Sequence, residues 1–341
     1  MNKVFLGPLD LGLNQVFKEA LEKEGYKVTT CSFVEHGNYG WKNDIELKIN
    51  KTNLLFAIGR VFGNFFKSLN YDIYHFKFGQ SLLPWNLDLP ILKLLGKKII
   101  MNWHGQDIRQ WDRFKNDPYN KILAEKMSGG WFKEWKKHCR YHCVKFFTDF
   151  QAVSTPDLLE FAPVAKYMPE MAPAERISAE ISNSKFLISK TQGIVTILHA
   201  PSHRGIKGTE YIIKAVENLK KEGEKIELLL AENVPADKMG EYYQKADLVI
   251  DQLLIGTYGV VSVEGMLAYK PVICYIREDL KKVYPESLPV ISANPDNIKE
   301  TIKDTLKKDL QILGEKSFEY VSKTHLPEVM AREWAKVYRE F

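Results

Sequence analysis

The chain has 341 residues, of which 45% are hydrophobic, 12% aromatic and 27% charged, with a formal net charge of +5. This length exceeds what one hydrophobic core usually organises, and the composition excludes long disorder and a fibrous repeat. No uninterrupted apolar run reaches 18 residues and the N-terminus carries no signal-peptide pattern, so we expect a cytoplasmic protein without a membrane span.

The first half of the chain alternates short apolar runs with amphipathic segments, the pattern of βαβ units around a parallel sheet. A strand is predicted at Lys3 to Leu6, a helix at Leu13 to Glu24 and a second strand at Tyr26 to Thr30. Short apolar runs predict further buried strands at residues 73–76, 98–102 and 150–154. Prolines interrupt the pattern between Pro163 and Pro173, where we expect the connection between two domains.

A second α/β series follows this connection. Strands are predicted at residues 193–198, 227–230, 248–250 and 272–275, and helices at 209–222, 239–246 and 263–268. The order βαβαβαβ predicts a second Rossmann-like domain. We therefore expect an N-terminal domain at residues 1–165, a C-terminal domain at 166–325 and a final helix at 326–341.

The segment KKIIMNWHGQDIR, residues 97–109, combines an apolar strand with polar residues at its carboxyl end. It delivers His104 to the edge of the sheet, followed by Gly105, Asp107 and Arg109. An imidazole at this place can donate a hydrogen bond to a ligand or stabilise charge without a metal ion. A structural hydrogen bond at the strand end is the alternative role.

Residues 97–147 carry twelve Lys or Arg against five Asp or Glu, and they are rich in aromatics. Such a segment can form a helix that lies on an anionic membrane surface, and VFGNFFKSL, residues 61–69, can add to it. This suggests peripheral contact with the inner face of a membrane. A solvated helix with a packed aromatic face is the alternative. No nucleic-acid-binding motif accompanies the charge, so nucleic acid is not an expected partner.

The motif HCRYHC, residues 138–143, places two histidines and two cysteines one helical turn apart. A second ligand pair with zinc-finger spacing is missing from the sequence. We therefore predict no metal site.

The strongest local signal is ILHAPSHRGIKGTEYIIKAVENL, residues 197–219. A strand enters a loop that carries Arg204 and Lys207, and Gly208 and Thr209 then open a helix. Free main-chain N–H groups and the helix dipole favour anions at such a junction, and the two cations would neutralise a diphosphate. A surface loop with two solvated charges is the alternative.

A second signal is ADLVIDQLLIGTYGVVSVEGMLAYKPVICY, residues 246–275. After a strand ending near Ile250, a loop carries Asp251, Gly256, Gly259 and Val260, and a helix with Glu264 follows. Such a loop brings main-chain amides to a ligand at the carboxyl edge of the sheet. A solvent-facing glutamate is the alternative for Glu264, and turn capping is the alternative for Asp251.

Together these stretches resemble the glycosyltransferases of the GT-B fold, and particularly the retaining enzymes of family 4 (glycosyl transferases group 1). The resemblance implies an α/β fold with two Rossmann-like domains facing each other across a cleft, and a C-terminal helix that crosses back to the N-terminal domain. In that family an Arg and a Lys hold the donor diphosphate, and an E-x7-E loop reads the donor sugar and ribose. A similar His-Gly-x-Asp strand end approaches the donor sugar and the acceptor.

Carried over residue by residue, the resemblance implies catalytic roles for His104, Arg204 and Lys207. It implies donor contacts from Gly208, Gly256, Gly259, Val260 and Glu264. Lys207 and Glu264 match the family pattern, whereas Arg204 lies at a different spacing. Gly256 stands where the first glutamate is usual, and Asp251 is a candidate to supply the missing contact to the donor sugar.

The sequence therefore predicts a metal-independent hexosyltransferase of polysaccharide biosynthesis. It would need no cofactor beyond its co-substrate, a UDP- or GDP-sugar, and its acceptor would be a glycan or a lipid-linked sugar. Gly256 motivates an alternative, a noncatalytic GT-B subunit or nucleotide-sugar sensor. A GT-B phosphorylase or epimerase is a further alternative.

Overall fold

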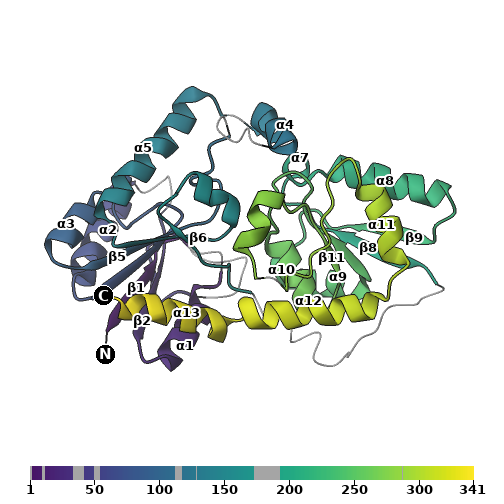
Figure 1. The fold of residues 1–341 in the computed structure, drawn as a ribbon. Coiled ribbons are helices and arrows are strands. Elements are labelled where there is room, and N and C mark those ends of the chain that lie inside the picture. The colour runs from purple at the N-terminus through teal and green to yellow at the C-terminus, as the bar shows by residue number, and fades with distance from the viewer. Residues whose placement is uncertain are drawn as a thin grey trace. The chain divides into compact units, whose positions relative to one another are not determined.

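The computed structural model describes residues 2–9, 12–33, 42–49, 54–111, 117–127, 129–172, 193–285 and 287–341, without the side chains of 54–58. The chain divides into two compact units (Figure 1). The first unit comprises Met1–Gln110, Gly129–Met171 and Pro327–Phe341, and the second comprises Trp111–Ser128 and Ala172–Leu326. Pro173 and Phe114, at the predicted connection and in the aromatic segment, lie outside the described residues.

A seven-stranded parallel sheet forms the centre of the first unit, in the order β3-β2-β1-β4-β5-β6-β7. The central strands are buried along nearly their whole length because helices cover both faces of the sheet. The strands are β1 (Lys3–Gly7), β2 (Lys27–Ser32), β3 (Ile45–Glu46), β4 (Ile73–Lys77), β5 (Lys98–Trp103), β6 (Phe150–Val153) and β7 (Lys166–Tyr167).

The helices of this unit form two layers. Right-handed crossovers place α1 (Asn14–Lys23) on one face of the sheet, and α2 (Leu54–Ser68), α3 (Asp88–Leu94) and α5 (Trp131–Phe147) on the other (Figure 1). The final helix, α13 (Pro327–Arg339), packs beside α1, and its Trp334 and Tyr338 join the core with Phe17 and Val28. Short 3₁₀ helices, η1 (Pro84–Asn86) and η2 (Pro156–Glu160), complete the unit.

The second unit is built on a four-stranded parallel sheet in the order β11-β10-β8-β9. Its strands are β8 (Val195–His199), β9 (Ile226–Leu230), β10 (Leu248–Ile250) and β11 (Val272–Ile273). Its helices are α4 (Pro118–Met127), α7 (Arg204–Lys207), α8 (Thr209–Lys221), η3 (Ala236–Lys238), α9 (Met239–Lys245), α10 (Val260–Leu267), η4 (Glu278–Val283), α11 (Ile298–Leu306) and α12 (Leu310–Thr324). Ile197, Ile212, Leu248 and Ile302 lie in its core.

The fold class predicted from the sequence is confirmed, since each half contains a parallel α/β sheet of the Rossmann type. Two features differ from the predicted boundaries. The segment Trp111–Ser128 belongs to the second unit although it lies within the N-terminal half of the sequence, and the first unit extends to Met171. No helix among the described residues is long and apolar enough to span a membrane.

Candidate functional site

Two neighbouring strands of the second sheet lead to opposite sides of that sheet. From β8 the chain continues through α7 and α8 to the edge strand β9, whereas from β10 it continues through α10 to the other edge, β11. In open parallel sheets this change of direction leaves a crevice at the carboxyl ends of the two strands, and ligands bind in such crevices. The two motifs found in the sequence follow β8 and β10 and therefore meet at this point.

Lys207 joins the two loops. Its Nζ donates hydrogen bonds to Asp251 Oδ1 at 2.7 Å and to Gln252 Oε1 at 2.8 Å, so a side chain of α7 is tied to the end of β10. A Cβ at Gly259 would lie 3.3 Å from Lys207 Nζ and 3.2 Å from Asp251 Oδ2. The Lys207 ammonium group therefore lies at the start of α10. Because Gly259 has no side chain, the ammonium group can approach the main chain there.

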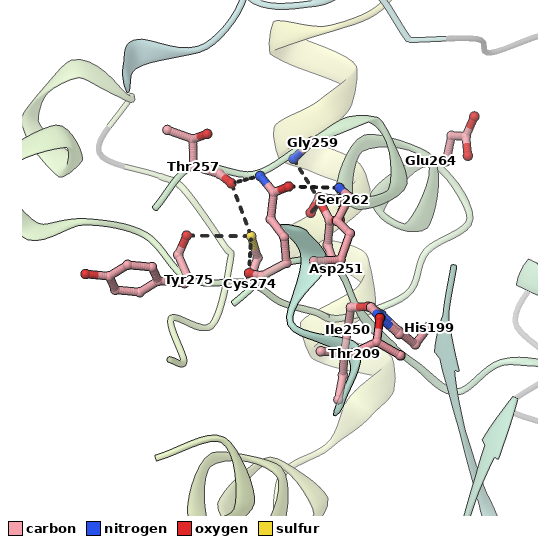
Figure 2. A network of polar contacts seen from close by, with 12 residues as sticks. His199, Thr209, Ile250, Asp251, Thr257, Gly259, Ser262, Glu264, Cys274 and Tyr275 are labelled. Carbon is pink, nitrogen blue, oxygen red and sulfur yellow. Dashed lines mark hydrogen bonds and ion pairs between the residues drawn. The ribbon is translucent and has the colours of Figure 1, made fainter. Parts of the chain in front are cut away.

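Asp251 orders the first turn of α10 (Figure 2). Its Oδ2 accepts hydrogen bonds from the Gly259 N–H at 2.9 Å and from the Ser262 hydroxyl at 2.8 Å. Burial raises the pKa of Asp251, but the Lys207 charge and these hydrogen bonds outweigh burial and hold the pKa below its ordinary value. The carboxylate is therefore ionised at neutral pH. With only 1% of the residue exposed, it directs both oxygens into the protein.

A buried histidine connects the strand ends that carry these loops (Figure 2). His199 Nδ1 is 2.8 Å from the Ile250 carbonyl oxygen, which can only accept, so Nδ1 carries the proton. His199 Nε2 then accepts a hydrogen bond from the Thr209 hydroxyl at 2.9 Å. Burial lowers the pKa of His199 to about 4, which keeps the imidazole neutral. His199 thus fixes the end of β8 against β10 and the start of α8.

Arg204 is directed to different partners from Lys207, although both belong to α7. Its guanidinium pairs with Glu210 and with Glu232, each at 2.8 Å, and 42% of the side chain is exposed. Gly208 follows with φ of +76° and links α7 to α8. The structure brings Lys207, Asp251, Gly259 and Val260 together, and it leaves Arg204 in a separate surface cluster of charges.

Glu264 lies in the second turn of α10 and is half-buried. Its Oε2 accepts a hydrogen bond from the Tyr243 hydroxyl at 2.7 Å. Burial, followed by the adjacent Glu264 charge, raises the pKa of Tyr243 well above its ordinary value, so the phenol stays protonated and donates. Tyr243 therefore holds the carboxylate that the sequence assigns to the donor.

Gly256 has a physical reason to lack a side chain. Its φ is +89°, and a Cβ would lie 2.4 Å from Arg277 Cγ. Arg277 is almost fully buried and pairs with Asp279 through Nη2 at 2.6 Å, and its main-chain N–H donates to the Gly256 carbonyl at 2.9 Å. The aliphatic part of Arg277 occupies the space that a glutamate at position 256 would need.

The remaining predicted residue, His104, belongs to the first unit. Its Nδ1 is 2.7 Å from Glu170 Oε2, and its ring stacks on Phe78 with centroids 4.2 Å apart. Asp107 accepts hydrogen bonds from the main-chain N–H groups of His104 and Gly105. His104 Nε2 is buried and has no hydrogen-bond partner among the described residues. This buried nitrogen is available to a ligand.

Glu170 also lines a small pocket of about 20 Å³ within the first unit, which has room for about one water molecule. The pocket lies at the carboxyl ends of β4 and β5, where Lys77 donates to the Asn14 side chain at 2.7 Å. Asn102 Oδ1, which belongs to another lining residue, is buried without a hydrogen-bond partner in the part of the chain described. The first unit thus has a polar pocket beside His104.

Lys207, Asp251 and Glu264 were predicted from the sequence, but the residues that hold them were not. Gln252, Ser262 and Tyr243 are ordinary polar or aromatic residues without a motif, so no sequence signal identified them. His199 could have been identified from the sequence, because it is a histidine at the end of a predicted strand. Among the described residues no group of three or more His, Cys, Asp or Glu side chains is placed to hold a metal ion.

No protein-family model and no curated protein matches this sequence. Solved structures do resemble it over the full chain. Sucrose-phosphate synthase from Thermosynechococcus elongatus has 13% identity and a TM-score of 0.63, with 100% of this chain and 99% of that one covered. HepE from Anabaena, in complex with UDP and glucose, has 12% identity and a TM-score of 0.62, with 100% of both chains covered.

A candidate UDP-N-acetylglucosamine 2-epimerase from Listeria monocytogenes has 15% identity and a TM-score of 0.57, with 100% of this chain and 97% of that one covered. At these identities the likeness establishes the fold. The chain has the GT-B fold that the sequence predicts, with two Rossmann-like units.

Proposed function

We propose that this chain is a retaining, metal-independent glycosyltransferase that moves a hexose-type sugar from a nucleotide-sugar donor to a glycan or glycolipid acceptor. The observation that carries the proposal is the Lys207 ammonium, held by Asp251 and Gln252 at the start of α10 and at the switch point of the second sheet. Cationic groups and helix N-termini at such a point bind phosphates. The similarity to HepE, crystallised with UDP and glucose, supports a sugar nucleotide as the ligand.

We assign the donor diphosphate to Lys207 and to the main-chain N–H groups of Val260 and Val261. These N–H groups belong to the first turn of α10 and have no partner within the helix. Glu264, held by Tyr243, would accept hydrogen bonds from the ribose hydroxyls. Arg204 would reach the diphosphate only after exchanging Glu210 or Glu232 for phosphate oxygens, so we expect it to contribute less than Lys207.

In the proposed reaction the bond between the sugar C1 and the diphosphate oxygen breaks, and a bond from C1 to the acceptor hydroxyl oxygen forms. The acceptor oxygen attacks C1 on the face from which the diphosphate departs, so the configuration at C1 is retained, and the acceptor proton passes to the departing diphosphate oxygen. Negative charge grows on the departing oxygen in the transition state, and the positive end of α10 and Lys207 would stabilise it. No protein nucleophile is required by this scheme.

We assign the acceptor to the first unit, at His104 and the adjacent pocket lined by Lys77, Asn102 and Glu170. The unpartnered His104 Nε2 and Asn102 Oδ1 would satisfy their hydrogen-bonding capacity with sugar hydroxyls.

The test is a panel of UDP-, GDP-, ADP- and dTDP-sugars, scored for thermal stabilisation and for slow release of free nucleotide with and without EDTA. We expect one nucleotide to raise the melting temperature and to be hydrolysed equally well with EDTA present. Proton NMR of the first sugar released should show the anomer of the donor. Failure of every nucleotide to bind would contradict the proposal, and loss of turnover in EDTA would contradict its metal independence.

A second candidate is a noncatalytic nucleotide-sugar sensor or an epimerase. Gly256 in place of the usual glutamate and the likeness to a candidate epimerase favour it. Binding without release of nucleotide under any acceptor mixture would support the sensor, and an isomerised donor in the absence of acceptor would support the epimerase.

A further inference from the structure

Three helices on one face of the first sheet carry most of the exposed large hydrophobic side chains in the described part of the chain. Of the 15 such side chains, 11 lie on α2, on η1 with α3, and on α5. They are Phe62, Phe66, Trp85, Leu87, Ile91, Leu94, Leu95, Trp131, Phe132, Trp135 and Phe146. We call the exposed surface of these helices the outer helical face.

The crossover connections place α2, α3 and α5 in one layer on the same side of the sheet, opposite α1 and α13 (Figure 1). The exposure is large on η1 and α3 and at both ends of α5: 88% for Trp85 and Leu94, 75% for Trp131 and 80% for Phe146. Surfaces of this kind are rare on proteins that have no partner there.

The first turns of α5 are inverted relative to an ordinary surface helix, whereas its second half buries Tyr141 and Val144. Its first turns bury Glu134 and Lys137, which pair at 3.2 Å, and Lys137 also donates to the Arg109 carbonyl at 2.7 Å. The aromatic residues Trp131, Phe132 and Trp135 face outward, stacked with ring centroids about 6 Å apart. A helix selected for contact with water alone would show the reverse distribution.

The charge on the outer helical face has one sign. The exposed residues on described parts of α2, η1, α3 and α5 include Arg60, Lys67, Lys133, Lys136, Arg140 and Lys145 but no Asp or Glu, and Lys93 of α3 pairs with Asp149 beyond α5 at 2.7 Å. Lys136 Nζ lies 4.4 Å from the centroid of the Phe132 ring, so cations and aromatics are interleaved. Aromatic rings flanked by lysines match the boundary between anionic lipid headgroups and acyl chains.

We propose that the outer helical face docks the protein on an anionic lipid bilayer. This redefines the membrane contact expected from residues 97–147. Trp111–Ser128 belongs to the other unit, and α2, η1 and α3 add apolar residues that the charge count did not single out. The proposal does not depend on the proposed enzymatic function, because docking is measured without a sugar nucleotide.

The experiment measures co-sedimentation of the full chain with two kinds of vesicle, phosphatidylcholine alone and phosphatidylcholine with 30% phosphatidylglycerol. We expect binding to the anionic vesicles that weakens as salt rises. Replacing Trp85, Leu94 and Trp131 together by Ser should weaken binding at least tenfold, because these side chains would no longer bury apolar surface in the bilayer. Ile312→Ser, an exposed apolar residue of α12, is the control and should leave binding unchanged.

A charge-matched pair of variants separates local attraction from net charge. Lys133→Gln, Lys136→Gln and Arg140→Gln on α5 should together weaken binding at least tenfold. The same loss of three charges at Lys214, Lys220 and Lys221 on α8, in the second unit, should have little effect.

Equal weakening by the α5 and α8 variants, or absence of binding to anionic vesicles, would overturn the proposal. Concentration-dependent dimerisation in sedimentation velocity that the Trp85, Leu94 and Trp131 variant abolishes would do the same, since it would assign this face to a second copy of the chain.

Discussion

At position 256 both the positive φ of the main chain and the nearby Arg277 side chain exclude a residue with a side chain. Gly256→Ala should destabilise the second unit through the positive φ and through contact of the new Cβ with Arg277 Cγ. Gly223→Ala isolates the first effect, because Gly223 has φ of +92° with no atom within 4 Å of an added Cβ. We expect Gly223→Ala to cost about 1 kcal/mol and Gly256→Ala to cost a further 1 to 3 kcal/mol from overpacking.

Hydrogen-exchange mass spectrometry in urea measures the free energy of unfolding of the second unit separately from that of the first, for both variants. Equal costs for the two variants would show that Arg277 does not occupy the space beside Gly256. The sequence identified this position only as a departure from the E-x7-E pattern. The reason for the glycine lies in Arg277, 21 residues further along, and no local pattern joins the two.

His199 predicts how the stability of the second unit depends on pH. Burial lowers its pKa from 6.5 to about 4, so the unfolded chain binds more protons between these values. The contribution of His199 to the free energy of unfolding is fully present above pH 6.5. It is lost as pH falls toward 4, and the total loss is about 3 kcal/mol. The depressed pKa of Asp251 contributes stability that is lost only when pH falls below its unfolded value of 3.8, outside this window.

His199→Gln preserves one donor toward Ile250 and one acceptor for Thr209 but does not titrate. The variant should lose less stability than the parent between pH 6.5 and 4.5, as measured by hydrogen-exchange protection of β8 and β10. His75, whose pKa burial also lowers, is common to both proteins and cancels in the difference. Parallel pH profiles would contradict the buried neutral imidazole.

At the scale of elements, α4 illustrates what the sequence does not reveal. Asn120 on this helix, with its amide oriented to satisfy its neighbours, donates to the Leu254 and Ile255 carbonyls at 2.7 and 3.1 Å. Its oxygen then accepts from Arg277 Nη1 at 3.1 Å. These bonds tie Trp111–Ser128 to the loop that follows β10, and they join segments more than 130 residues apart.

Asn120→Ala should therefore destabilise the second unit by about 2 kcal/mol, because it leaves two carbonyls and a guanidinium N–H without their partner. Limited proteolysis should cleave the variant faster within Trp111–Ser128. Asn218→Ala, in α8, is a control on the half-buried side of a helix in the same unit. Unchanged cleavage of the Asn120 variant would mean that α4 is held by other contacts.

Other elements were predictable because their signals are local. The strand Leu248–Ile250 and the starts of α8 and α9 agree with the apolar periodicity. The prediction placed the start of α10 at Val263, three residues later than the observed Val260, because its cap is the distant carboxylate of Asp251. In α5 the aromatic pattern predicted an amphipathic helix, but burial of Glu134 and Lys137 in its place could not be read from periodicity.

For the whole molecule, the order of strands and helices predicted two Rossmann-like domains, and the resemblance of the motifs to GT-B glycosyltransferases predicted the GT-B fold. Right-handed crossovers and buried parallel strands then fix which loops meet at the carboxyl edge of each sheet. Strand order thus explains why Lys207 and Gly259 converge. It does not specify the nucleotide or the acceptor, because these depend on side-chain shapes at the loops.

The central claim is that Lys207 at the start of α10 binds the donor diphosphate. Removing Lys207 alone would leave the Asp251 carboxylate buried without its cation and would cost about 3 kcal/mol or more of stability. The double variant Lys207→Gln with Asp251→Asn removes both charges and should remain folded. As a control, Glu134→Gln with Lys137→Gln replaces a buried ion pair of the first unit.

The most direct measurement is isothermal titration of the nucleotide identified in the panel against the parent chain and these two double variants. We predict that the Lys207 and Asp251 variant, with its melting temperature retained, binds at least about tenfold more weakly, as expected for the loss of a charge-assisted hydrogen bond to phosphate. The Glu134 and Lys137 variant should bind like the parent. Unchanged affinity in the Lys207 and Asp251 variant would contradict the account and would place the diphosphate elsewhere.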